Sequence, residues 1–169
     1  MGLNPGSACS AITNKPALRT GFHLPPFTFQ FYYMSQYESS VKCIPFPQER
    51  VYAKLEDLNN LEAIKDKLPA DKVQDFKYSR DEASATISPL GNLTIKVVNR
   101  EAPKCIKLEA VGSPFPTNMW IQIIPDGEAA SKLRVVLKTE LNFMIRSMIE
   151  GPLKDGIEKI AEVLSVIQY

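Results

Sequence analysis

The residue types that perform acid–base and nucleophilic chemistry are sparse in this chain of 169 residues. Its single histidine, His23, lies in a proline-rich N-terminal stretch, so residues 34–169 contain none. A Ser-His-Asp triad, a Cys-His pair and a histidine-ligated metal site each need at least one histidine. The sequence therefore predicts neither a metal nor another cofactor for residues 34–169.

Tyrosines and carboxylates are the remaining candidates for catalysis. Tyr37, Tyr52 and Tyr78 can donate a hydrogen bond to a carbonyl, and Glu109 and Glu140 can act as a base. The alternation of apolar and polar residues around both glutamates places them on the outer face of their strands. We therefore predict no catalytic residue, and an enzyme is kept as an alternative.

Residues 1–33 differ in composition from the rest of the chain, because they contain no Asp or Glu and four prolines. Pro5, Pro16 and Arg19 interrupt every apolar run long enough for a secretory signal. We expect an N-terminal extension outside the domain, either disordered or upstream of a functional start at Met34. A targeting peptide is the alternative, since such peptides are poor in acidic residues. We predict one domain over residues 34–169 and a cytoplasmic location.

The overall charge argues against several classes of partner. Lys and Arg number 20 against 19 Asp and Glu, so no broad basic field attracts nucleic acid. No stretch approaches the ~20 apolar residues that an integral membrane helix requires. The sequence carries no signal for the oligomeric state.

The elements that must position any site follow from hydrophobic periodicity. Residues 34–43 alternate as a strand, with Tyr37, Val41 and Cys43 on the buried face. Spacings of three and four in PQERVYAKLEDLNNLEAIKDKLP predict two short helices. Strand-like runs separated by turn residues follow, which predicts an antiparallel meander. The predicted strands are Val73–Ser79, Ala83–Ser88, Leu93–Arg100, Cys105–Val111, Met119–Ile124 and Leu133–Leu141.

A long apolar stripe predicts a C-terminal helix over Asn142–Ile167. Gly151-Pro152 interrupts this segment, but the stripe continues in phase across it. We therefore expect one helix with a kink rather than two separate helices.

The order strand, two short helices, six strands and a long helix resembles the helix-grip fold of the START-like or SRPBCC superfamily. This superfamily includes lipid-transfer domains, birch-pollen-type allergens and polyketide cyclases. The resemblance covers residues 34–169, and PFPQERVYAKLEDLNNLEAIKDKLP and GPLKDGIEKIAEVLSVIQY are similar to small bacterial members. It implies an α+β fold, in which a seven-stranded antiparallel sheet curls around the C-terminal helix and leaves a cavity between them.

Period-2 alternation predicts an almost entirely aliphatic inner face. We expect this face to bind a hydrophobic or amphipathic small molecule or lipid without turning it over. The alternatives are a cyclase- or hydratase-type enzyme and a protein-interaction module with a filled core. The predicted cavity-lining residues are Ile87, Ile95, Leu108, Phe115, Met119, Trp120, Ile121, Leu137, Phe143, Met148 and Ile149. Trp120 alternates with Met119 and Ile121, so either set can face inward.

Overall fold

The computed structural model describes residues 33–67, 71–88 and 91–169. The predicted N-terminal extension, apart from Tyr33, lies outside the described residues. The elements follow one another as β1 (Tyr33–Glu38), β2 (Lys42–Ile44), α1 (Gln48–Leu55), the 3-10 helix η2 (Leu58–Leu61), α2 (Glu62–Lys65), β3 (Val73–Tyr78), β4 (Glu82–Ile87), β5 (Gly91–Glu101), β6 (Cys105–Val111), β7 (Thr117–Pro125), β8 (Ser131–Leu141) and α3 (Phe143–Ser165).

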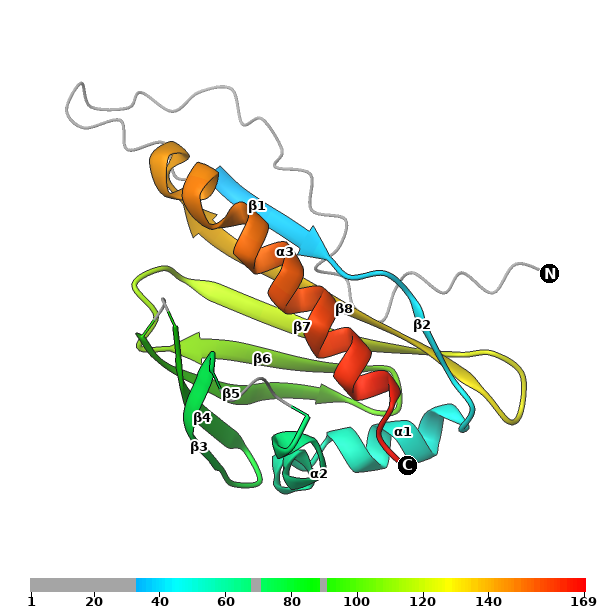
Figure 1. Cartoon of the computed structure of the whole chain (residues 1–169). Helices are drawn as coiled ribbons and strands as arrows, with labels where there is room; N and C mark the ends of the chain where they lie inside the picture. Colours follow the sequence, from blue (N-terminus) through cyan, green and yellow to red (C-terminus); the bar gives the residue numbers. More distant parts are fainter. Residues whose placement is uncertain (1–32, 68–70, 89–90) are drawn as a thin grey trace, which may run out of the picture.

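All the strands belong to one antiparallel sheet that curls around α3 without closing (Figure 1). Its order is β1-β8-β7-β6-β5-β4-β3, and the short β2 also pairs with β8. Short turns join β3 to β8 in sequence, as the predicted meander requires. The predicted α+β helix-grip architecture is confirmed, with eight strands in the described part of the chain in place of seven.

The additional strand arises because the first predicted strand is broken. Glu38 pairs with Val136 and Lys42 pairs with Leu133. The segment from Glu38 to Lys42 is therefore one residue longer than the segment of β8 from Leu133 to Val136. An extra residue reverses which side chains face inward. Val41 and Cys43 are therefore exposed, although continuous alternation predicted that both would share the buried phase of Tyr37.

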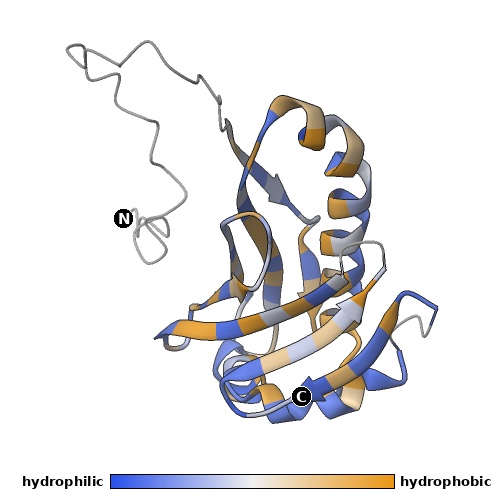
Figure 2. Cartoon of the chain, turned by 90° about the vertical axis from the view of Figure 1, so that its left-hand side faces the viewer, coloured by the Kyte–Doolittle hydropathy of each residue, from blue (hydrophilic) through white to orange (hydrophobic). Residues whose placement is uncertain are grey.

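The hydrophobic core lies between the inner face of the sheet and the helices that pack on it. Figure 2 shows hydrophobic and hydrophilic residues alternating along the strands, as the period of two requires. Helix α1 contacts β7 and β8 at one end, and α3 contacts β8, β1 and β2. Deeply buried inward side chains on the strands include Ile44, Ile106, Leu108, Ile123, Leu133, Val135 and Leu141.

Helix α3 is continuous over its 23 residues, with Pro152 inside it, which confirms one helix rather than two. The Asn142 side chain caps its start by accepting a hydrogen bond of 2.9 Å from the Ile145 amide. The buried residues of α3 are Ile157, Ala161, Val163 and Leu164, all beyond Pro152. Its C-terminal half is therefore the part that is held firmly on the sheet.

Within the described ranges, none of the helices combines the length and the apolar character needed to cross a membrane.

A polar contact also ties the C-terminal half of α3 to the connection between β1 and β2. The Glu158 carboxylate accepts hydrogen bonds from the Ser40 amide at 2.8 Å and from the Ser40 hydroxyl. The Lys42 ammonium lies 2.5 Å from the same carboxylate. Hydrogen bonds from Lys42 and Ser40 lower the pKa of Glu158 from 4.5 to about 2, and the one from Lys42 has the largest effect.

We expect Glu158→Gln to lower the free energy of unfolding at pH 7, by at most about 1 kcal/mol because the carboxylate is partly exposed and solvent screens it. A depressed pKa stabilises the fold above the unfolded-state value and loses that contribution as pH falls through the folded-state value. The difference in unfolding free energy between the unsubstituted protein and Glu158→Gln should therefore become smaller as the pH falls from 4.5 to about 2. Urea unfolding at pH 7 and pH 2.5 measures it, and a difference independent of pH would contradict this role.

Candidate functional site

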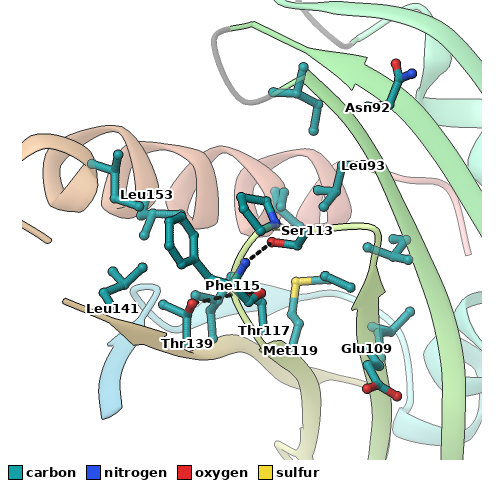
Figure 3. A pocket seen from close by; sticks show the side chains of 18 residues that line it. Asn92, Leu93, Glu109, Ser113, Phe115, Thr117, Met119, Thr139, Leu141 and Leu153 are labelled. Carbon is teal, nitrogen blue, oxygen red and sulfur yellow. Dashed lines mark hydrogen bonds between the residues drawn. The ribbon is translucent and has the colours of Figure 1, made fainter. Parts of the chain in front are cut away.

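A cavity of about 210 Å³ lies between the inner face of strands β4 to β8 and α3. Its lining is mostly aliphatic and aromatic, and Figure 3 shows these side chains converging from the strands and the helix. The lining residues are Ile87, Asn92, Leu93, Ile95, Leu108, Glu109, Ala110, Ser113, Pro114, Phe115, Thr117, Met119, Leu137, Thr139, Leu141, Ile149, Leu153 and Ile160.

Strand register brings the floor of the cavity together. Leu108 on β6 pairs with Met119 on β7, which in turn pairs with Leu137 on β8. Directly paired residues of antiparallel strands point to the same face, so these three form one apolar row across the sheet. The neighbouring row contains Ala110, whose small side chain leaves space above it.

The wall of the cavity comes from α3 and from the turn between β6 and β7. Ile149 and Leu153 line the cavity from adjacent turns of the helix, and Ile160 lines it two turns further on, where its side chain is partly exposed. The turn begins at Gly112, whose φ of +79° is accessible to glycine at little cost. It brings Phe115 to the cavity lining.

The polar groups in the cavity are mainly hydroxyls. The Thr117 and Thr139 hydroxyl oxygens lie 2.9 Å apart, and Thr117 Oγ1 also lies 3.1 Å from the Phe115 carbonyl oxygen. The Ser113 hydroxyl accepts a weaker hydrogen bond of 3.3 Å from the Phe115 amide. The site can therefore form neutral hydrogen bonds within an otherwise apolar space.

Glu109 is the charged residue among the described lining residues, and its side chain is exposed. It pairs with Asn118 on the face of the sheet opposite to that of Leu108. Figure 3 shows its carboxylate directed away from the side chains around Phe115 and Met119. Glu140 is likewise in register with the exposed Met34, on the outer face.

The described part of the chain contains no cluster of side chains suited to binding a metal ion. No group of three or more His, Cys, Asp or Glu side chains is arranged to hold an ion there.

The structure gathers many of the predicted site residues around this cavity. Those that line it are Ile87, Ile95, Leu108, Phe115, Met119, Leu137 and Ile149. Ile121 faces the same inner side, but it packs in the filled part of the core beside Ile106 and Val135. Phe143 and Met148 are both 76% exposed on the first turns of α3 and do not line the cavity.

Trp120 lies on the outer face of the sheet. The Lys107 and Lys138 Nζ atoms are 5.4 and 5.5 Å from the centroid of its ring, within cation–π range. On β7 it is Met119 and Ile121 that point inward, because both pair with inward residues of β6 and β8. Trp120 therefore packs between lysines and does not reach the cavity.

Thr117 and Thr139 were absent from the set of residues predicted to line the site. Their signal was present in the sequence, because Thr117 is in phase with Met119, and Thr139 is in phase with Leu137. A search for apolar residues passes over such hydroxyls. Leu153 and Ile160 belong to the predicted helix stripe, but sequence periodicity does not reveal which turns of a helix face a cavity.

No family model and no curated protein matches the chain. Among solved structures, norcoclaurine synthase from Thalictrum flavum in complex with dopamine and hydroxybenzaldehyde has a TM-score of 0.64 at 11% identity, covering 86% of this chain and 94% of that one. A START superfamily protein from Mycobacterium smegmatis has a TM-score of 0.56 at 12% identity, covering 78% and 94%. A conserved protein from Geobacillus kaustophilus has a TM-score of 0.53 at 16% identity, covering 78% and 93%.

These likenesses show that the chain has a START-like helix-grip fold. At such low identities they show the fold alone, since one fold serves many functions.

We expect Ala110→Leu to stabilise the protein by about 1 to 2 kcal/mol, because three added carbons fill apolar space inside the cavity. Denaturant unfolding measures the change, and an unchanged slope with denaturant concentration shows that the two-state transition is retained. Destabilisation by a similar amount would mean that the space above Ala110 is already packed.

Proposed function

We propose that this protein binds a hydrophobic or amphipathic small molecule between the sheet and α3, without catalysing its conversion. The main support is the chemistry of the lining, which combines aliphatic and aromatic side chains with a few hydroxyls. Sites for small molecules are commonly concave, largely apolar and provided with a small number of placed polar groups. The open space favours a ligand site over a protein-interaction module with a filled core.

The size of the cavity favours a compact ligand. Its volume of about 210 Å³ is below the ~300–1,000 Å³ of typical sites for drug-sized molecules. A long-chain lipid would need the cavity to widen, whereas a molecule with one or two rings would not. The solved complex of norcoclaurine synthase, which shares the fold, holds the small aromatic molecules dopamine and hydroxybenzaldehyde.

An enzyme of the cyclase or hydratase type would need an acid or base within hydrogen-bond reach of the substrate. Glu109, the charged residue on the described lining, turns its carboxylate outward (Figure 3). The hydroxyls of Thr117 and Thr139 can orient a ligand, but unactivated threonines are weak acids and bases. Binding without turnover therefore fits this lining better than catalysis.

Met119→Lys and Met148→Lys make the same chemical change at two contrasting places. Met119 lines the cavity, whereas Met148 is 76% exposed. An unpaired ammonium in an apolar site is strongly unfavourable, so Met119→Lys should weaken binding of an environment-sensitive apolar fluorescent probe by about tenfold or more. Met148→Lys should leave the affinity unchanged.

Fluorescence titration measures both affinities, and circular dichroism checks that each variant is folded. An equal loss in the two variants would place the probe at the surface rather than in the cavity. If the unsubstituted protein binds none of a broad panel of apolar probes, the binding function is wrong and the interaction module becomes the leading alternative.

A further inference from the structure

Three hydroxyl side chains lie in one row across adjacent strands, and we call them the hydroxyl row. Ser35 on β1 pairs with Thr139 on β8, and Thr139 pairs with Thr117 on β7. Directly paired residues share a face of an antiparallel sheet, and both threonines line the cavity. The two threonines are therefore the part of the hydroxyl row that faces the cavity, and Ser35 extends the row onto β1 beyond the lining.

The hydrogen bonds within the row leave capacity unused at its Ser35 end. Each hydroxyl has one proton, so if Thr117 donates to the Phe115 carbonyl, Thr139 donates to Thr117. The lone pairs of Thr139 then remain able to accept. Ser35 Oγ has no hydrogen-bond partner among the described residues, although Ser35 is only 5% exposed.

A second buried hydroxyl lies beside the row. Tyr37 is the next inward residue of β1 and is 4% exposed, and its phenol oxygen also has no hydrogen-bond partner among the described residues. Buried polar groups in native proteins are nearly always hydrogen-bonded, because leaving them unpaired is costly. Neither Ser35 nor Tyr37 lines the cavity, so the hydroxyl that a ligand can pair with directly is that of Thr139.

The charges around the cavity show what kind of polar group can pair with this hydroxyl. No Lys or Arg is among the described residues that line the cavity. Lys107 and Lys138 of the neighbouring strands lie against Trp120 on the outer face. A buried carboxylate or phosphate needs a cation or several donors to replace its hydration. The lining therefore disfavours an anionic ligand.

We propose that the ligand is a compact, uncharged molecule with an apolar body and a hydroxyl or carbonyl group, which binds at the hydroxyl row Ser35–Thr139–Thr117. This rests on the proposed binding function and adds the ligand's chemical class and orientation. A hydroxyl group donates a hydrogen bond to Thr139, and a carbonyl group accepts one from Thr139 when Thr117 donates to Thr139. The apolar body lies along the row formed by Leu108, Met119 and Leu137.

Three ligands that share one ring system test this proposal on the full chain by titration calorimetry at pH 7. They are naphthalene, 2-naphthol, which is uncharged at this pH as phenols are, and the anion 2-naphthoate. We expect 2-naphthol to bind about five- to tenfold more tightly than naphthalene, the gain typical of one hydrogen bond in a buried site. The 2-naphthoate anion should bind more weakly than naphthalene.

Thr139→Val, which removes a lining hydroxyl with little change of shape, should remove the advantage of 2-naphthol and leave the affinity for naphthalene unchanged. Thr139→Ala removes the same hydroxyl, and it gives a second test if Thr139→Val does not fold. Ser131→Ala is the matched control, because Ser131 is equally buried but donates to the Phe46 carbonyl and does not line the cavity. It should change neither affinity.

The outcomes separate this inference from the proposed function. If naphthalene and 2-naphthol bind equally well, or the advantage survives both Thr139→Val and Thr139→Ala, the hydroxyl row does not hold the ligand. Tighter binding of 2-naphthoate would overturn the assignment of an uncharged ligand. If none of the three binds and the broad panel of apolar probes also fails, the binding function itself is wrong.

Discussion

The packing of the C-terminal half of α3 on the curled sheet is the interaction on which the remaining structure depends. The sheet does not close, so its apolar inner face must be covered by helices. Ile157, Ala161 and Leu164 are almost completely removed from solvent in this packing. A fully buried Ile or Leu contributes roughly 1.5–3 kcal/mol, more than an exposed ion pair provides. The Glu158 contact therefore adds to a position that burial already determines.

The cavity follows from the same packing, because the N-terminal half of α3 covers the sheet less tightly than the C-terminal half does. Ile149 and Leu153 are partly buried, and the small Ala110 opposite them leaves room. An apolar cavity in this position is surrounded by material of low polarity, in which hydrogen bonds and charges matter more than in water. A few hydroxyls can then discriminate between ligands of similar size.

The sequence was a good guide to the parts of the fold that depend on local pattern. Strand β6 has the predicted bounds Cys105–Val111, and the turns of the meander fall where Gly, Pro and Asp are concentrated. The extra residue between Glu38 and Lys42 could not be predicted, because it is defined by pairing with β8, almost a hundred positions away in the chain. Alternation continued through that break and gave Cys43 the wrong face.

The candidate site was predictable to the extent that it consists of inward strand residues. Leu108, Met119 and Leu137 follow from period-2 alternation once the sheet is known to be antiparallel. Phe143 and Met148 were placed near the site because they are large and lie at the start of the helix. Their exposure depends on how far α3 extends relative to the sheet, which a sequence pattern does not encode. The unpaired Ser35 hydroxyl is visible only when every neighbour is known.

Pro152 has a consequence for the rates at which a ligand enters and leaves. A proline inside a helix has no N–H, so the carbonyl of Met148 lacks its usual partner one turn later, and the helix bends most easily there. Ile149 lines the cavity from before Pro152, Leu153 and Ile160 line it from after Pro152, and the buried anchoring residues all follow it. A bend at this point would move Ile149 away from the sheet while the anchored turns stay in place. We expect this movement to govern residence time, while the strands determine which molecules are retained.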